Sequence, residues 1–138
     1  MLRNILGTLA GIAVAMLVML AIEYLDGLLY PLPADIDLDD PVVTAGLIAA
    51  MPLPAKLIVV SAWLLGAFAG TWAALRITDW RWSAAIVTAL VVIGGVMNFL
   101  ALPHPVWMQV CAVLLPLAGR ALGIALHRKP YPGEPLLG

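Results

Sequence analysis

The sequence predicts an all-α membrane protein: a four-helix transmembrane bundle with a short interfacial helix in its first outer loop. Three observations favour this fold class. Four long apolar segments fill most of the 138-residue chain. Charged residues make up 11% of it, against about 25% in soluble domains. The segments are continuous apolar runs, whereas the strands of a membrane β-barrel alternate in hydrophobicity over about ten residues.

Each segment is long enough to cross a membrane, because about 20 helical residues span the roughly 30 Å hydrocarbon core. The predicted spans are 4–24, 55–76, 82–102 and 106–127, and Arg120 is the one charged residue between 105 and 126. The spans form a single domain, 1–129, with no room for a separate soluble domain. The tail 130–138, with three prolines and two glycines, is expected to be disordered.

The first span contains a small-x-small sequence, Ala13-Val14-Ala15, of the kind found at signal-peptide cleavage sites. The apolar run continues to Ile22, so cleavage there would leave an apolar stub. We therefore expect this span to be retained as a membrane helix.

The distribution of charge predicts the orientation. Five basic residues fall on one side of the predicted bundle: Arg3, Arg76, Arg81, Arg128 and Lys129. The other side holds Lys56 and six of the eight acids: Glu23, Asp26, Asp35, Asp37, Asp39 and Asp40. By the positive-inside rule both termini lie in the cytoplasm, and the expected location is a bacterial inner membrane.

The predicted outer loop, 25–54, contains one further helix. Pro31 and Pro33 exclude helix interior after the first span, since proline removes a donor and restricts its neighbour. Asp40 followed by Pro41 is a favourable helix start, with aspartate at the N-cap and proline at the first position. We therefore expect a short helix over 41–51, too short to cross the membrane.

Small residues recur four apart in three spans, which places each set on one helix face. The sets are Gly7, Gly11 and Ala15; Ala62, Gly66, Gly70 and Ala74; and Gly119 with Gly123. Such stripes let two helix backbones approach closely. They either pack the helices of one bundle, or at least one of them joins copies in a homo-oligomer.

The fourth span carries one polar line. Gln109, Pro116, Arg120 and His127 fall on one helix face at 100° per residue. An ionisable residue inside a span is a functional candidate, so Arg120 could serve as an interior charge. Alternatively its long side chain snorkels to the headgroups at the nearby helix end.

A second polar group is expected at the outer end, where Glu23, Asn98, His104 and Gln109 should lie at similar depth. His104 with the loop carboxylates Asp35, Asp37 and Asp39 could bind a divalent cation. The spacing matches no established calcium loop, however. The alternatives are a solvated acidic loop and a histidine that caps helix ends in the turn.

Several function classes lack support. The chain has no glycine-rich phosphate loop, no HExxH motif and no convincing Ser–His–Asp order. Its single cysteine, Cys111, excludes an intramolecular disulfide and reads as a small buried apolar residue. A net charge of −1 without a dense basic cluster argues against nucleic acid. No cofactor is predicted, although a bound lipid would fit such a chain.

Three local patterns carry a resemblance: Glu23 followed by Tyr30-Pro31-x-Pro33, Trp63-x-x-Gly66-x-x-x-Gly70, and Pro103-His104-Pro105-x-Trp107. In these features the chain resembles a loose family of uncharacterised small bacterial four-span inner-membrane proteins. The resemblance covers nearly the whole chain, and it implies a shared fold but no known activity.

The leading functional hypothesis is a non-enzymatic membrane protein that acts by helix packing, as a self-associating or accessory structural subunit. Its expected partners are membrane lipid and either further copies or a larger membrane complex. The alternative is a small oligomeric transporter or channel that uses Gln109, Arg120 and His127, or Glu23 and His104. A membrane-embedded enzyme acting on a lipophilic substrate beside His104 is a third hypothesis.

Overall fold

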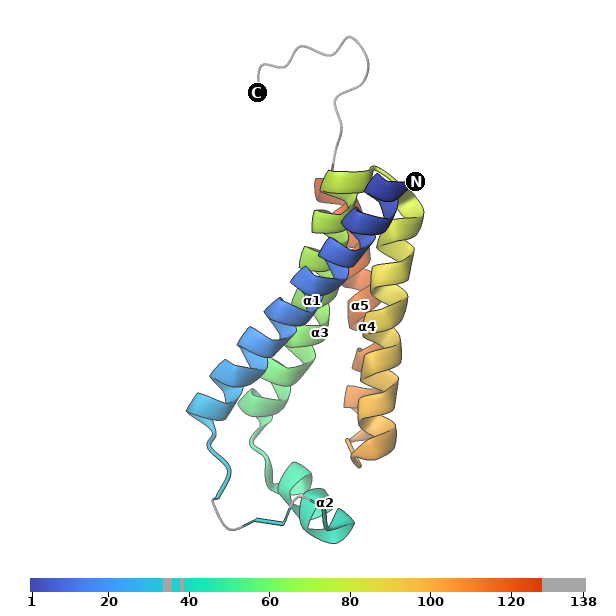
Figure 1. The fold of residues 1–138 in the computed structure, drawn as a ribbon. Helices are drawn as coiled ribbons and strands as arrows, with labels where there is room; N and C mark the ends of the chain where they lie inside the picture. Colours follow the sequence, from blue (N-terminus) through green and yellow to red (C-terminus); the bar gives the residue numbers. More distant parts are fainter. Residues whose placement is uncertain (34–35, 38, 128–138) are drawn as a thin grey trace.

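The computed structural model describes residues 1–33, 36–37 and 39–127, and it confirms the predicted fold class (Figure 1). Its helices are α1 Leu2–Leu29, α2 Pro41–Ala50, α3 Leu53–Thr78, α4 Arg81–Ala101 and α5 Val106–Leu126. All but α2 are long and apolar enough to cross a membrane. The described residues form no strand. Asp35, Arg128, Lys129 and the predicted disordered tail 130–138 lie outside the described residues.

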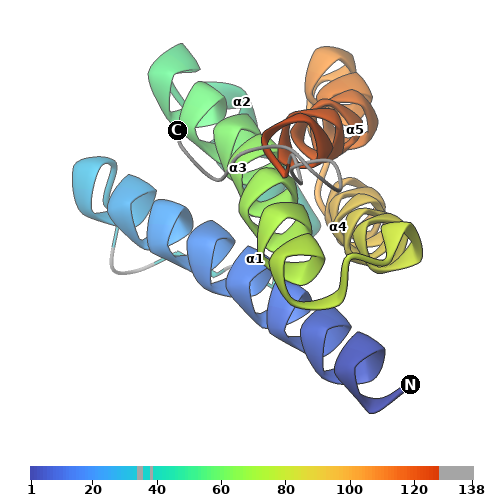
Figure 2. The same ribbon diagram turned by 90° about the horizontal axis from the view of Figure 1, so that it is seen from above.

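The long helices run alternately up and down, so the bundle has two distinct ends (Figure 1). The start of α1, the α3–α4 turn and the end of α5 share one end, called here the Arg3 end. The opposite, or α2, end holds α2 and the α4–α5 turn. Helix α3 is central and packs against α1, α4 and α5 (Figure 2). Helix α1 crosses α3 obliquely and diverges from α4 and α5 toward the α2 end (Figures 1 and 2).

The first span is longer than the predicted 4–24. Residues after Glu23 stay helical as far as Leu29, and the N–H of Tyr30 donates to the carbonyl oxygen of Asp26 at 2.8 Å. The helix ends there because Pro31 disfavours a helical conformation in the residue before it. Glu23 is therefore not at the end of its helix, and the link between the first two spans is shorter than predicted.

The short helix α2 begins where the sequence predicts. The side chain of Asp40 accepts a hydrogen bond from the backbone N–H of Val42 at 2.8 Å, and Pro41 occupies the first turn. Thr44 and Ile48 are its buried residues. Helix α2 lies beyond the ends of the long helices (Figure 1). It forms part of the link between α1 and α3 and does not pack inside the bundle.

Glycines allow a close backbone contact between α1 and α3. A Cβ atom added to Gly70 would lie 2.6 Å from the carbonyl oxygen of Gly11, and one added to Gly11 would lie 2.7 Å from that of Gly70. Backbone meets backbone here, so no side chain larger than hydrogen fits without moving a helix. Gly7 faces Thr78, and Gly66 faces Met19, along the same seam.

Glycines also allow the backbones of α3 and α5 to approach closely. Gly119 lies against the carbonyl oxygen of Leu64, and a Cβ on Gly123 would lie 3.1 Å from that of Phe68. All the small residues predicted for helix packing are buried within one copy: Gly7, Gly11, Ala62, Gly66, Gly70, Ala74, Gly119 and Gly123. None of these stripes is left as a free surface.

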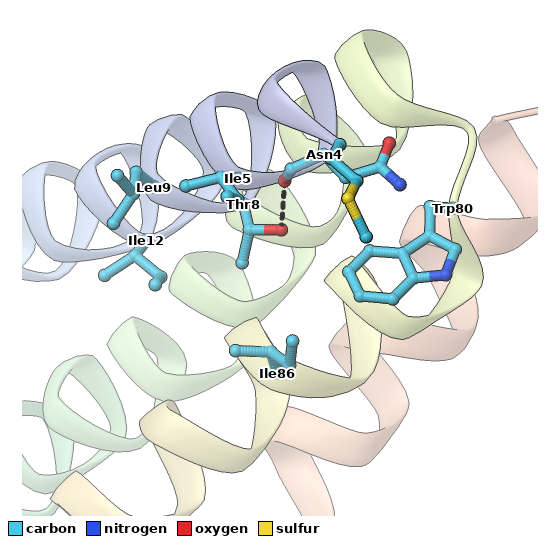
Figure 3. A pocket seen from close by; sticks show the side chains of 8 residues that line it. Asn4, Ile5, Thr8, Leu9, Ile12, Trp80 and Ile86 are labelled. Atoms are coloured by element: carbon cyan, nitrogen blue, oxygen red, sulfur yellow. Dashed lines mark hydrogen bonds between the residues drawn. The ribbon is translucent and has the colours of Figure 1, made fainter.

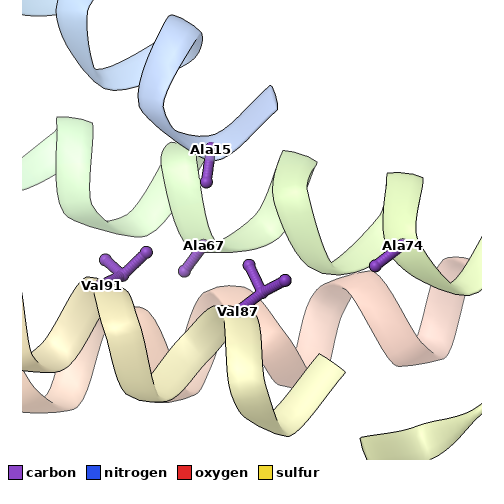
Figure 4. Close-up of a cluster of buried hydrophobic side chains, with 5 residues drawn as sticks. All are labelled: Ala15, Ala67, Ala74, Val87 and Val91. Carbon is purple, nitrogen blue, oxygen red and sulfur yellow. The ribbon is translucent and has the colours of Figure 1, made fainter. Parts of the chain in front are cut away.

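The apolar core consists mainly of small side chains (Figure 4). One cluster brings Ala15 of α1 against Ala67 and Ala74 of α3 and Val87 and Val91 of α4. A second cluster, nearer the α2 end of α3 and α5, contains Val60, Trp63, Met108 and Ala112. The core therefore depends on close approach of the helix backbones. Trp63 is the one aromatic residue among the buried members of these two clusters.

Candidate functional site

The densest polar cluster lies in the α3–α4 turn, at the Arg3 end. The hydroxyl oxygens of Thr78 and Ser83 are 2.8 Å apart, and both residues are buried. Thr78 Oγ1 also accepts the backbone N–H of Trp80 at 3.1 Å, while Ser83 Oγ donates to the carbonyl oxygen of Trp80 at 2.6 Å. These bonds satisfy groups that helix termini leave unpaired, and they fix the angle between the two helices.

Two longer side chains connect this turn to the other helices. The Nε2 atom of His127, just after α5, lies 2.9 Å from Oδ1 of Asp79. The guanidinium of Arg3 in α1 donates to the carbonyl oxygen of Thr78 at 3.4 Å. Residues of α1, α3 and α4, and His127 after α5, therefore all make contacts at the same turn.

The middle of the bundle contains one buried hydroxyl pair. The Oγ1 atoms of Thr71 in α3 and Thr88 in α4 are 3.4 Å apart, and Thr88 Oγ1 donates to the carbonyl oxygen of Ala84 at 2.8 Å. Both side chains are buried between the helices. They act as interhelical contacts in the way that hydroxyl groups commonly do in membrane proteins.

The polar line predicted on α5 does not form one site. Gln109 and His127 lie about 27 Å apart along the helix, at opposite ends of the bundle. Gln109 donates to the carbonyl oxygen of His104 at 2.9 Å, whereas His127 pairs with Asp79. Pro116 is buried between them. The Nε of Arg120 is also buried, and it has no hydrogen-bond partner among the described residues.

The predicted outer cluster of Glu23, Asn98, His104 and Gln109 forms only in part. His104 and Gln109 meet in the α4–α5 turn, where His104 Nδ1 also lies 2.9 Å from the carbonyl oxygen of Leu102. Glu23 is exposed on α1, which diverges from α4 and α5 toward this end (Figure 1). Asn98 is exposed on α4. The sequence analysis grouped these residues because they lie at similar depth in the membrane. Depth alone does not show that α1 follows an oblique path (Figure 1), which carries Glu23 away from the other three.

The suggested cation site gains no support from the described part of the chain. No three histidine, cysteine, aspartate or glutamate side chains there are close enough to hold a metal ion. Asp37 instead accepts the backbone N–H of Asp39 at 3.0 Å, a local turn contact. Asp35, the remaining predicted ligand beside His104, lies outside the described residues.

One concave surface is a groove between α1 and α4, called here the α1–α4 groove. Its first hollow, of about 540 Å³, lies at the Arg3 end and is shown in Figure 3. The residues that line it are Met1, Asn4, Ile5, Thr8, Leu9, Ile12, Trp80 and Ile86. A second hollow, of about 300 Å³, adjoins it at Ile12 and continues toward the α2 end between Met19 and Gly94. The groove is almost wholly apolar, and it is open along its length.

Helix α2 forms a further hollow with the segment that follows α1. This space, of about 550 Å³, lies between residues 30–33 and the α2 residues Thr44, Leu47 and Ile48, with Leu102, just after α4, on one side. It is apolar as well. Its prolines leave few free polar groups with which a specific ligand could bond.

The half of α4 nearer the α2 end holds an exposed glycine, Gly94, and an exposed amide, Asn98, that the sequence analysis did not connect. A Cβ atom added to Gly94 would meet no atom within 4 Å. Asn98, four residues further on, lies on the same face. Its side chain makes no hydrogen bond with the described residues. The neighbouring Met97 is 61% exposed.

The sequence analysis missed the residues of the α3–α4 turn. Thr78, Asp79 and Ser83 flank the link between two spans, and His127 follows the last span on the same predicted side. This shared side was the available signal for an Asp79–His127 pair. Gly95 packs against Ala112, whereas Gly94 is exposed. No pattern in the sequence indicates this difference between the two glycines.

Together these features define a four-span helical bundle whose described polar groups mainly serve helix capping and interhelical contact. No protein-family model matches the chain, and no curated protein or solved structure matches it either. The functional argument therefore depends on the molecule's own surfaces.

Proposed function

We propose that the protein is a self-associating structural subunit of a membrane, and that two copies dock through the outer half of α4. The observation that carries the proposal is the exposed pair formed by Gly94 and Asn98. No catalytic step is part of the proposal. The function is the assembly itself, or the support of a larger complex built on it.

Gly94 supplies the place of closest approach. The other small-residue stripes are already used inside the copy, but a Cβ at Gly94 would find open space. A second helix could therefore approach the α4 backbone at this position as closely as α1 approaches α3 at Gly70. Leu90 and Met97, 45% and 61% exposed, lie on either side of it and would pack around the crossing point.

Asn98 supplies a reason for the contact to form. It lies about 25 Å along α4 from Arg81, still within a hydrocarbon core of roughly 30 Å if Arg81 is at the opposite boundary. An amide without a partner is costly in hydrocarbon. Hydrogen bonds between polar side chains of membrane helices contribute about 0.6 kcal/mol on average and up to about 2 kcal/mol.

A second copy is the occupant that best fits this surface. The carboxamide of Asn98 contains both a donor and an acceptor, so it can pair with the same group across a two-fold axis. A two-fold interface uses one patch on both partners, which suits a narrow face with one glycine and one amide. The charged residues of the chain lie mostly near the ends, so the two copies would not bring like charges together at midspan.

The experiment measures the mass of the assembly in nanodiscs by native mass spectrometry, for the wild type and two variants. We expect a dimer for the wild type. Gly94→Leu should give a monomer because the added side chain blocks close approach. The substitution is suited to the test because a Cβ at Gly94 meets nothing within its own copy. Asn98→Leu should weaken the dimer while adding no steric obstacle.

The matched control is Leu114→Ala on α5, a side chain that is 57% exposed on another face of the bundle. It should leave the dimer unchanged. In a Cys111→Ala background, Met97→Cys should form a disulfide between copies. A monomeric wild type, or a dimer unaffected by both α4 substitutions, would refute the proposed interface.

A further inference from the structure

The face of α4 that carries Gly94 is one wall of the α1–α4 groove. Gly94 and Leu90 line the second hollow of this groove together with Met16 and Met19 of α1. A helix that approaches the α4 backbone at Gly94 must therefore lie in the groove, where it meets α1 as well as α4. A contact between two copies at Gly94 is for this reason wider than one pair of helices.

The length of the groove suits a helix that spans the membrane. Its two hollows adjoin at Ile12 and together extend along α1 from Met1 to Met19, about 27 Å at 1.5 Å per residue. This length is close to the roughly 30 Å of the hydrocarbon core, whereas one lipid chain reaches through a single leaflet of about 15 Å. A single occupant that fills the groove from end to end is therefore a helix.

The lining of the groove suits α4 of a second copy. Among the residues that the structure describes, no charged side chain lines either hollow, and α4 carries no charge after Arg81. Met16 is 59% exposed and Leu90 is 45% exposed, so both side chains are available for a further contact. Methionine is unbranched and adapts to irregular surfaces, which allows Met16 and Met19 to pack against an uncharged helix.

Two-fold symmetry indicates which residues meet. A two-fold interface uses the same surfaces on both copies, so α4 of each copy would lie in the groove of the other. Leu90 and Gly94 line the groove of their own copy and would face the second α4. Ile93 is 56% exposed, lines neither hollow and lies about 100° around the helix axis from Gly94. It is therefore on the side of α4 that would meet α1 of the second copy.

We propose that α4 of a second copy occupies the α1–α4 groove, and that Met16 of α1 contacts Ile93 of that second copy. The inference rests on the proposed dimer through Gly94, and it adds α1 to the interface. Helices α1 and α4 both begin at the Arg3 end, so a two-fold axis along the membrane normal keeps Met16 and Ile93 at similar depth (Figure 1). One contact then covers the grooves of both copies.

The test uses two versions of the chain in a Cys111→Ala background, one with Met16→Cys and a mass tag, the other with Ile93→Cys. They are reconstituted together in liposomes, oxidised mildly and weighed by mass spectrometry. A disulfide requires Cβ atoms about 4 Å apart, so a mixed disulfide reports direct contact. We expect the mixed disulfide to form, and to be lost when Gly94→Leu is added to both versions. Leu114→Cys in place of Ile93→Cys is the matched control, because Leu114 is similarly exposed, at 57%, on α5.

Native mass spectrometry separates the failure of this inference from the failure of the dimer. If a dimer forms and Gly94→Leu breaks it, but Met16→Cys pairs no better with Ile93→Cys than with Leu114→Cys, the groove contact is overturned and the dimer stands. A monomeric wild type overturns both. Lipid that stays bound to each copy and is expelled by Ile86→Trp, with no mixed disulfide, would show that lipid covers the groove instead.

Discussion

Asp79 and His127 join the α3–α4 turn to the end of α5, with His127 Nε2 lying 2.9 Å from Asp79 Oδ1. Asp79 also has a φ of 54°, in the left-handed region that aspartate, asparagine and glycine tolerate best. The two side chains are 28% and 13% exposed, so water screens the contact only in part. One residue therefore both shapes the turn and holds a third helix against it.

Separating these two roles requires two substitutions of Asp79. Asp79→Asn keeps an acceptor and tolerates the left-handed conformation, so it removes mainly the negative charge. Asp79→Ala removes the acceptor and adds a backbone penalty of about 1–2 kcal/mol. We expect the free energy of unfolding in mild detergent to fall by about 2 kcal/mol for alanine and by less than half of that for asparagine. Equal losses for the two variants would assign the whole effect to the charge.

Alanine substitution should have opposite effects on stability at Gly70 and at Gly94. Gly70→Ala places a Cβ 2.6 Å from the carbonyl oxygen of Gly11, so α1 and α3 must separate. A loss of about 2–3 kcal/mol in the free energy of unfolding is expected, as for other overpacked cores. Gly94→Ala meets no atom within 4 Å and should raise helix stability slightly, because alanine is the better helix former.

Thermal unfolding of the two variants in the same detergent checks this prediction. The measurement should be made at a concentration where the wild type is monomeric, so that any α4 contact between copies does not contribute. Similar unfolding midpoints for the two alanine variants would show that the α1–α3 seam adapts to an extra methyl group.

The features of the fold that the sequence predicts follow from the properties of the membrane interior. Hydrocarbon requires that backbone groups be paired within each span, so apolar length and the loop prolines were enough to predict four spans and the helix begun by Asp40 and Pro41. The stripes containing Gly70 and Gly119 likewise indicated where backbones meet. The end of α1 was less predictable, because Glu23 and Asp26 are compatible with helix and only Pro31 stops it.

The candidate sites were less predictable because they depend on how helices are oriented around one another. Depth in the membrane suggested that Glu23, His104 and Gln109 would meet, but α1 diverges and only the last two do. Rotation about a helix axis decides that Gly95 is packed and that Gly94 is free. A hydropathy pattern that is apolar on every face of the helix does not encode that rotation.

The buried hydroxyl groups of the α3–α4 turn should contribute measurably to stability. Ser83 Oγ bonds both the carbonyl oxygen of Trp80 and the Thr78 hydroxyl, at 2.6 and 2.8 Å. Ser83→Ala leaves these groups short of a buried partner, so the free energy of unfolding should fall by about 1–2 kcal/mol. Ser61→Ala is the control, because its hydroxyl bonds only to Ile58 of its own helix, at 2.7 Å. A drop as large for Ser61→Ala as for Ser83→Ala would mean that the turn has no special role.

Arg120 provides the test that distinguishes a structural charge from a functional one. Its Nε is buried without a hydrogen-bond partner among the described residues, and such a donor costs about 1–3 kcal/mol. Arg120→Met keeps an unbranched apolar side chain and removes that donor, so we expect the unfolding midpoint to stay constant or rise. Arg3→Met should lower it slightly, because Arg3 donates to the carbonyl oxygen of Thr78.

The two methionine variants should be compared in detergent and again in nanodiscs that contain anionic lipid. If Arg120 only snorkels toward headgroups, the Arg120→Met variant keeps the assembly mass and the retained lipid of the wild type in both. A destabilisation above about 2 kcal/mol that occurs only in nanodiscs would instead show that the guanidinium binds an anion from the membrane. Arg120 would then bind a membrane anion from its place on α5.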